Sequence, residues 1–287
     1  MKAKIFNQKL IGSLKRRRDI IIKKFSLKYK NGKFEFLRIA SKQILKQDKI
    51  ILITAGFHGD EKAGSLSILE YANKIIDYAH KKGLKIIIYP LINPSGFEKN
   101  TRYNIDKDHG EVGNSDFIRY ELKDGKIIDD LGAGKDFKKW YWSSDKKFKH
   151  RMPRETQLVH KLLKKEPLKQ ISAIIDLHQN PANSWRGPYT YQYAFENKNF
   201  LKNIAKKISK ILPIIKNEMM DAEYYGTGVK TDNNGFIVRH DGCIADLFYR
   251  INKYSVTVET TTSTPIDKAM LVNLTWIIEI INLINSK

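Results

Sequence analysis

Apolar residues in this chain gather in short continuous runs, and these runs are separated by segments with helical spacing. The runs that indicate buried strands lie at 33–40, 49–56, 84–93, 171–178, 188–195 and 254–260. Helical spacing of apolar residues marks 62–83, 198–212 and 267–285. Apolar strands that alternate with helices are typical of a largely parallel sheet covered on both faces. We therefore predict a single-domain α/β/α sandwich with a mixed, largely parallel central sheet.

The predicted domain occupies residues 1–287, and two segments depart from its rhythm of strands and helices. Residues 1–30 are rich in basic side chains, and we predict that they form an N-terminal extension. Residues 105–150 mix glycine, acidic and aromatic residues, which indicates an elaborated insertion over one end of the sheet. This insertion lacks the character of a separate domain, and no internal repeat is apparent.

The composition is that of a globular protein in a reducing compartment. Hydrophobic residues make up 41% of the chain and charged residues 29%, which suits a sizeable core. The single cysteine, Cys243, excludes an internal disulfide. The N-terminal segment lacks the uninterrupted apolar core of a signal peptide, and no apolar run approaches the length of a membrane span. We expect a soluble cytoplasmic protein with no membrane partner.

The net charge of +21 raises the question of an acidic partner. Lysines are scattered along the chain, and only "KRRR" at 15–18 forms a tight basic cluster. No zinc-finger, aromatic RNA-binding or basic-zipper pattern accompanies this cluster. A lysine-rich solvated surface is therefore favoured over specific nucleic-acid binding, and the charge is compatible with acidic substrates.

Polar residues that could carry chemistry follow several predicted strands. His58 and Glu61 stand three residues apart after one strand, and His178 and Glu259 end two others. Ligands of such sheets bind at the carboxyl ends of the strands, and two histidines with a glutamate are typical donors of a catalytic zinc site. The alternative is that each is a hydrogen-bonded structural residue. Asp176 should share a strand face with His178, either as the partner of a metal ligand or as a buried salt-bridge acid.

Four ordered motifs between residues 50 and 262 resemble the zinc carboxypeptidase family, the carboxypeptidase A-like metallopeptidases. They are "HGDE" at 58–61, "NPSGFEKNTRYN" at 93–104, "DLH" at 176–178 and "TVET" at 257–260. The similarity is closest to compact bacterial members such as murein peptide amidase. Each motif is weak alone, but their common order makes the resemblance specific.

The resemblance implies a role for each matching residue. His58, Glu61 and His178 would bind one zinc ion per chain. Glu259 would be the general base that takes a proton from the zinc-bound water and returns it to the leaving amine. Arg102 would polarise the scissile carbonyl and stabilise the oxyanion, a task that suits a permanently charged guanidinium.

Two recognition elements of the family have no direct counterpart. The family's Asn-Arg pair, which holds the terminal carboxylate of the substrate, is represented by Asn114 and Ser115. Arg119 is our candidate for the missing arginine. Tyr224 and Tyr225 are candidates for the family's mobile tyrosine, and we select Tyr225 as the substrate-binding residue.

These observations predict a zinc-dependent metallopeptidase that hydrolyses a peptide or muropeptide-like amide bond, of carboxypeptidase or murein peptide amidase type. The alternative enzyme is an N-acyl amino acid deacylase of the aspartoacylase and succinylglutamate desuccinylase group, which shares "HGDE". The motif at 93–104 favours the peptidase. A basic nucleic-acid-binding protein with an inactive hydrolase fold would lack a ligand or catalytic residue, and all of them are present.

Overall fold

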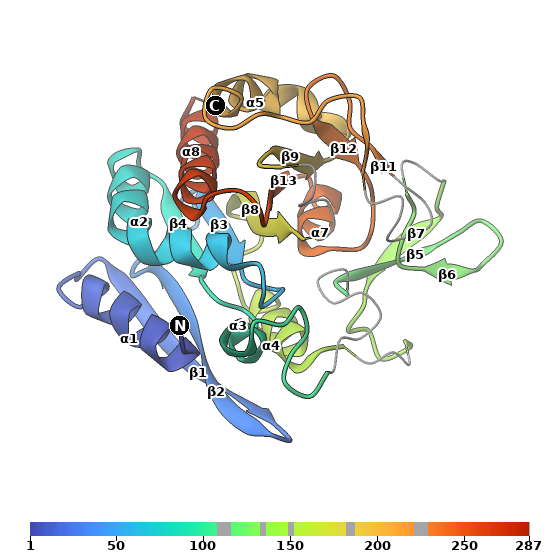
Figure 1. The fold of residues 1–287 in the computed structure, drawn as a ribbon. Coiled ribbons are helices and arrows are strands. Elements are labelled where there is room, and N and C mark those ends of the chain that lie inside the picture. Colours follow the sequence, from blue (N-terminus) through green and yellow to red (C-terminus); the bar gives the residue numbers. More distant parts are fainter. Residues whose placement is uncertain (108–115, 133–135, 149–151, 182–186, 221–228, 287) are drawn as a thin grey trace.

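The computed structural model describes residues 1–107, 116–132, 136–148, 152–181, 187–220 and 229–286. Its centre is one eight-stranded sheet with the strand order β1-β2-β4-β3-β8-β13-β9-β12. In this order the strands are β1 (Ile20–Tyr29), β2 (Gly32–Ser41), β4 (Lys85–Tyr89), β3 (Ile50–Ala55), β8 (Ile171–Asn180), β13 (Tyr254–Thr261), β9 (Thr190–Ala194) and β12 (Phe236–Val238). Figure 1 shows this sheet through the middle of the molecule.

The four strands at the centre of the sheet are parallel to one another. β4 pairs with β3, β3 with β8, and β8 with β13, each in parallel register. The pairs β1–β2, β2–β4 and β13–β9 are antiparallel, and β9–β12 is again parallel. The predicted mixed, largely parallel sheet is therefore confirmed. Its central strands are buried on both faces, which is why they read as continuous apolar runs.

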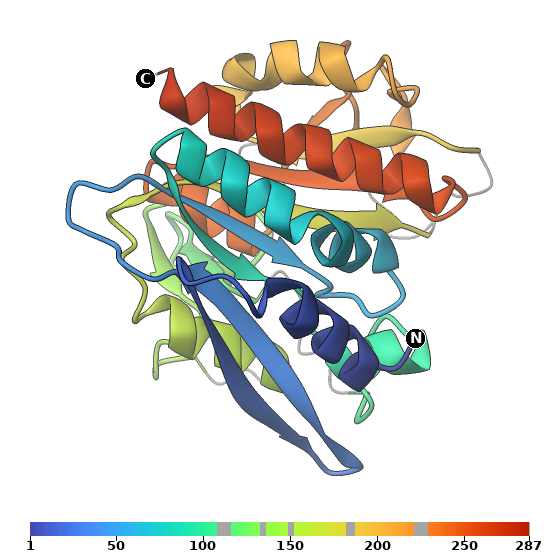
Figure 2. The ribbon, with the colours of Figure 1, turned by 90° about the vertical axis from the view of Figure 1, so that its left-hand side faces the viewer.

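Helices cover both faces of the sheet, and each face has its own apolar core. α1 (Ala3–Leu14), α2 (Lys62–Lys81), α5 (Lys202–Ile208) and α8 (Ile266–Asn285) pack on one face, as Figure 2 shows. α4 (Arg154–Leu163) and α7 (Ile244–Arg250) pack on the other. Successive side chains of a strand point to opposite faces. Ile175 and Leu177 of β8 therefore lie in the first core, while Ile174 lies in the second.

The N-terminal residues differ from the predicted extension over 1–30. β1 pairs with β2 along its whole length, from Ile20 opposite Ser41 to Tyr29 opposite Gly32. α1 buries Phe6 and Leu10 in the same core as α2. The sequence pattern did not indicate β1, because lysines interrupt the apolar residues of this edge strand. Charged residues on an edge strand protect it from pairing with another chain.

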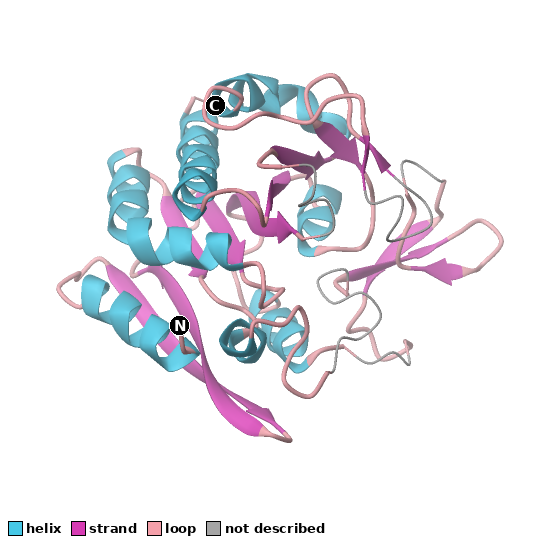
Figure 3. Ribbon diagram, viewed as in Figure 1, coloured by secondary structure: helices cyan, strands magenta, loops and turns pink. Residues whose placement is uncertain are grey.

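The predicted insertion at 105–150 contains a small antiparallel sheet with the order β6-β5-β7. These strands are β6 (Ile127–Ile128), β5 (Ile118–Glu121) and β7 (Lys139–Trp142), shown in magenta in Figure 3 beside the large sheet. Ile118 and Tyr120 are buried in the core that α4 and α7 share. The small sheet is thus anchored to the face of the large sheet that carries these two helices.

The remaining elements are short. They are α3 (Pro94–Lys99), the 3-10 helix η3 (Glu196–Leu201), β10 (Met219–Met220) and β11 (Val229–Lys230). Within the described ranges, no helix combines the length and apolar character that a membrane span requires.

Candidate metal centre

Three polar side chains converge at the carboxyl edge of the central strands. β3 ends at Ala55, His58 lies in the turn that follows, and Glu61 is the N-cap residue directly before α2. His178 lies near the end of the neighbouring strand β8, where Leu177 is in register with Ala55. Parallel register brings the ends of β3 and β8 together, so residues far apart in the chain become neighbours.

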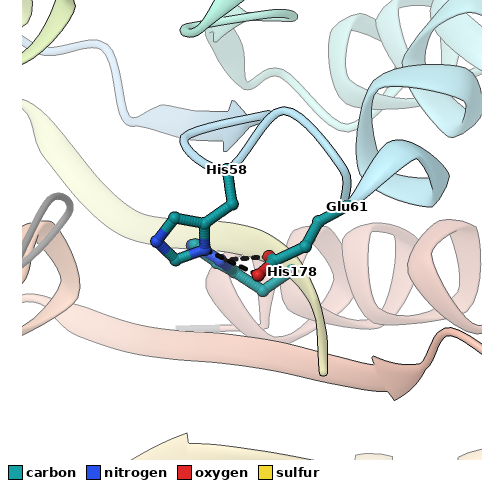
Figure 4. Close-up of side chains that lie close together, drawn as sticks. All are labelled: His58, Glu61 and His178. Atoms are coloured by element: carbon teal, nitrogen blue, oxygen red, sulfur yellow. Dashed lines mark hydrogen bonds and ion pairs between the residues drawn. The ribbon is translucent and has the colours of Figure 1, made fainter. Parts of the chain in front are cut away.

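The three side chains meet through the Glu61 carboxylate (Figure 4). His58 Nδ1 lies 2.6 Å from Glu61 Oε1, and His178 Nδ1 lies 2.8 Å from Glu61 Oε2. One candidate ligand atom from each residue lies within 4.8 Å of the other two, and all three residues are buried. The structure therefore brings together the three residues that were predicted as metal ligands.

Asp176 holds the His178 ring from the side away from Glu61. The Asp176 Oδ2 atom lies 3.0 Å from His178 Nε2, and Thr54 donates a hydrogen bond of 2.7 Å to Asp176 Oδ1. A hydrogen bond from Nε2–H to a carboxylate fixes the ring orientation and leaves Nδ1 as the ligand atom. Of the two interpretations open for Asp176, the structure shows contact with the candidate ligand.

Burial and the neighbouring charges shift the pKa values of the cluster in different directions. Burial lowers the pKa of His58 to about 4. Burial also opposes a charged His178, but the carboxylates of Asp176 and Glu61 outweigh it and hold its pKa well above the usual value. Burial opposes an ionised Glu61 as well, yet the two histidines outweigh it and hold its pKa well below the usual value. Glu61 is thus the ionised carboxylate that both histidines of the cluster contact.

The donor set fits a zinc ion. Zinc sites in proteins use imidazole nitrogens and carboxylate oxygens, and ligating histidines commonly donate their other ring N–H to a carboxylate. His58, Glu61 and His178 supply such donors, and Asp176 supplies the supporting carboxylate for one imidazole.

Arg102 reaches this cluster from the loop after α3. Its Nη1 atom donates a hydrogen bond of 2.8 Å to Glu61 Oε1, and its side chain is 25% exposed. Asn93 positions the segment, because its side chain accepts from Gly96 N at the start of α3 and donates to the Arg102 carbonyl. The partly exposed guanidinium is therefore held beside the buried ligands.

The close packing of two glycines completes this arrangement. A Cβ atom on Gly59 would lie 2.0 Å from the Gly96 carbonyl carbon, so the backbone of the "HGDE" turn lies directly against α3. Gly59 N also donates to the Arg102 carbonyl at 3.1 Å. A side chain at Gly59 would separate the turn from the arginine loop.

Glu259 lies on β13 in parallel register with His178 on β8. In parallel strands, residues in register present their side chains to the same face. Glu259 is 9% exposed and its strand ends at Thr261. The structure therefore places Glu259 at the same edge and on the same face as the candidate ligand His178.

Of the predicted substrate-binding residues, the structure describes Arg119. Arg119 is 4% exposed, and its Nη2 atom lies 3.1 Å from the buried Asp116 carboxylate. This ion pair gives Arg119 a structural role within the small sheet, and its role in carboxylate binding remains a prediction. The predicted residues Asn114 and Tyr225 lie outside the described residues, as do Ser115 and Tyr224.

Two supporting residues were not predicted from the sequence. The Gln179 backbone N–H donates to Glu61 Oε2 at 3.1 Å, and its side chain accepts from Ala63 N at 2.8 Å. The Phe57 ring stacks on the His178 ring with centroids 6.2 Å apart and planes 4° apart. Each residue is next to a predicted ligand in the sequence, and this adjacency is the feature from which a supporting role could have been predicted.

His58, Glu61 and His178 thus form a cluster at the carboxyl edge of the mixed sheet that could hold a metal ion. Residues 18–273 match the family model described as zinc carboxypeptidase, and the chain belongs to that family. The family of metallopeptidases predicted from the four motifs is confirmed. No curated protein sequence matches the chain significantly.

Three solved structures illustrate the shared fold. A protein assigned as a metallopeptidase from Shewanella baltica OS155 has a TM-score of 0.65 and 19% identity, over 98% of this chain and 91% of its own. A metallo-carboxypeptidase from Burkholderia cenocepacia has a TM-score of 0.62 and 10% identity, over 98% and 68%. Bovine thrombin-activatable fibrinolysis inhibitor, solved with tick carboxypeptidase inhibitor, has a TM-score of 0.56 and 15% identity, over 98% and 97%. At these identities the likeness concerns the fold.

Proposed function

We propose that this chain is a zinc-dependent hydrolase of peptide or peptide-like amide bonds, of carboxypeptidase or murein peptide amidase type. The observation that carries the proposal is the buried cluster of His58, Glu61 and His178, with Arg102 hydrogen-bonded to it. Membership of the zinc carboxypeptidase family supports this chemistry over others that use the same donors.

The residues divide the work by their chemistry. His58, Glu61 and His178 would hold the zinc ion, whose chemistry in such sites is to polarise a carbonyl and to lower the pKa of water to about 7. Glu259 would accept a proton from the attacking water and deliver it to the leaving amine, as a positioned carboxylate can. Arg102 would stabilise negative charge on the carbonyl oxygen, since its guanidinium is permanently charged and partly exposed.

The role of Glu259 is tested by Glu259→Gln, which keeps the size of the side chain and removes its basicity. We expect zinc content and fold to be retained while turnover falls about a hundredfold or more. Turnover would be followed by mass spectrometry on muropeptides, dipeptides and N-acyl amino acids. Glu35→Gln, at an exposed position of β2, is the matched control and should keep full activity. Near-normal turnover by zinc-loaded Glu259→Gln would assign the proton transfer to another group.

The same panel distinguishes the substrate classes. Release of a C-terminal residue identifies a carboxypeptidase, internal cleavage of a muropeptide identifies an amidase, and hydrolysis confined to N-acyl amino acids identifies a deacylase. A carboxypeptidase should also require a free terminal carboxylate, because that group needs a charged partner in a desolvated pocket. Equal rates on one peptide with its C-terminus free and amidated would end the carboxypeptidase assignment.

Arg119→Ala tests the candidate partner of that carboxylate. If Arg119 binds the terminal carboxylate, the variant should raise the Michaelis constant for the free peptide and leave the amidated peptide unaffected, because binding common to ground and transition states is removed. If Arg119 serves only its ion pair with Asp116, the variant should lose stability and treat both peptides alike.

A further inference from the structure

A second pocket, separate from the candidate metal centre, lies where β7, η3 and the connection from α7 to β13 meet. Its volume is about 560 Å³, which is in the range of small-molecule sites. Five aromatic rings line it: Phe137, Trp140, Phe200, Tyr249 and Tyr254. Two cationic side chains, Arg250 and Lys253, line it as well. Among the described residues that form this pocket, none is acidic.

The pocket lies at the opposite end of the sheet from the metal centre. Tyr254 is the first residue of β13, whereas Glu259 lies near the end of the same strand. Five residues of an extended strand span about 17 Å at roughly 3.3 Å each. A molecule in this pocket therefore does not contact the reacting atoms, and the pocket is independent of the proposed function.

Arg250 is one of the two cationic residues that line the pocket. Its guanidinium lies over Phe137 at 4.7 Å and over Tyr249 at 5.2 Å from the ring centroids. Its Nε atom donates to the Tyr120 hydroxyl at 3.2 Å and lies 3.6 Å from Asp246. In the part of the chain that the structure describes, no hydrogen bond uses the two Nη atoms, although the side chain is only 14% exposed. A planar guanidinium with unused donors is suited to a carboxylate or phosphate.

Lys253 adds a second cation, and its ammonium group has donors available for further hydrogen bonds. Its Nζ atom donates to the Lys169 carbonyl at 2.8 Å, which uses one of the three donors of an ammonium group. Lys253 is half-buried, and this burial lowers the pKa of its ammonium group. An anion beside Lys253 would compensate for this lost hydration.

The aromatic rings provide the other half of the recognition surface. Phe200 is 49% exposed, and its ring meets that of Tyr254 at 5.6 Å in an edge-to-face arrangement. Trp140 and Phe137 come from the small sheet and its preceding loop. Rings of this kind stack on flat faces of a ligand, and they do so with bases, sugars and aromatic acids alike.

From these contacts we propose that this pocket binds a small organic anion that joins a flat ring to a carboxylate or phosphate. The oxyanion accepts hydrogen bonds from Arg250 and Lys253, and the ring lies against the aromatic walls. The competing interpretation is a purely structural clamp, in which Arg250 only fastens the small sheet to α7. The two interpretations differ in what the rim residues Phe200 and Lys253 do, since a clamp does not need them.

Isothermal titration calorimetry with matched ligand pairs tests the proposal on the zinc-loaded full chain. The pairs are adenosine monophosphate against adenosine, and phenylacetate against phenylacetamide, with inorganic phosphate as the anion without a ring. We expect at least one ringed anion to bind about tenfold more tightly than its neutral partner and than phosphate. The pair that shows the difference distinguishes a phosphate ligand from a carboxylate ligand.

Rim variants locate the binding. Phe200→Leu removes the ring but keeps apolar bulk, and Lys253→Gln removes the charge. Each should weaken binding of the ringed anion about fivefold to tenfold. Lys202→Gln, on the exposed start of α5, is the matched control and should leave binding unchanged. Absence of binding at millimolar ligand, equal binding of neutral and anionic partners, or unchanged affinity in both rim variants would each overturn the proposal.

Discussion

Two buried clusters among the described residues pair histidine with carboxylates, and their surroundings differ. In the first, the Glu61 carboxylate lies between the Nδ1 atoms of His58 and His178. In the second, Asp246 on α7 has one histidine neighbour, His240, whose Nδ1 atom lies 3.0 Å from Asp246 Oδ1. All five side chains are buried.

The difference lies in what surrounds each carboxylate. Asp246 also accepts hydrogen bonds from the Tyr120 hydroxyl and from the Gly242 backbone N–H, and Arg250 lies 3.6 Å away. These donors occupy the carboxylate, and they tie β5 of the small sheet to α7. Glu61 instead shares its site with two imidazoles that can each offer a lone pair to a metal. Burial of a histidine and an acid is therefore not enough for a metal site, because convergence of several lone pairs is also required.

The largest expected effect is on zinc content, which should depend on the histidines of the first cluster and not on His240 of the second. Protein purified without chelator should contain about one zinc ion per chain, and the His58→Ala, His178→Ala double variant should contain none, because zinc sites need at least three protein donors. His240→Ala is the matched control, since it also removes a buried histidine, and it should retain the metal. Elemental analysis gives the answer, with circular dichroism to confirm folding. Full metal content in the double variant would contradict the assignment.

The second prediction concerns Asp176, the aspartate that contacts the candidate ligand His178. Asp176→Asn keeps the size of the side chain but removes the negative charge beside His178 Nε2. Loss of such a partner costs about tenfold to a hundredfold in metal affinity, which competition with a chelator would measure.

Asp246→Asn is its counterpart in the other cluster. It should leave metal affinity unchanged but lower the free energy of unfolding by about 3 kcal/mol, because Arg250 and the other donors lose a buried charged acceptor. Urea denaturation would measure this loss. The comparison between the clusters fails if Asp246→Asn weakens zinc binding or if Asp176→Asn leaves it unchanged.

The central strands and the candidate ligands could be predicted because their signals are local. β3, β8 and β13 read as continuous apolar runs, and a polar residue of functional type stands at or just beyond the end of each. β1 was not predicted because lysines mask an edge strand. β12 and α7 were not predicted either, because three and seven residues are too few for a clear periodic pattern.

The parts that could not be predicted depend on contacts between distant segments. Arg119 was predicted as the arginine that binds the terminal carboxylate of the substrate, and the sequence did not indicate that its guanidinium also lies 3.1 Å from the buried Asp116 carboxylate. The second pocket combines side chains from residues 137 to 254, and no single stretch of the sequence carries its pattern. Only the fold brings such residues together, so their roles follow from the structure.

The smallest predicted effect concerns the only cysteine, which caps α7 beside Asp246. The Cys243 Sγ atom accepts a hydrogen bond of 3.4 Å from Asp246 N, and the residue is 5% exposed. Burial, with the nearby charges of Asp241 and Asp246, holds the pKa of the Cys243 thiol well above its usual value. The fraction of Cys243 present as the reactive thiolate is therefore lower than in the unfolded chain at any pH below that raised pKa, and this fraction increases as pH rises.

Iodoacetamide at pH 8 should alkylate Cys243 about tenfold or more slowly in the native protein than in urea, and mass spectrometry can follow this rate. Asp246→Asn should narrow that gap by loosening the cluster, whereas Asp176→Asn should not. Rapid alkylation of the native wild type would show that the second cluster is open to solvent, and the contrast with the metal centre would then be lost.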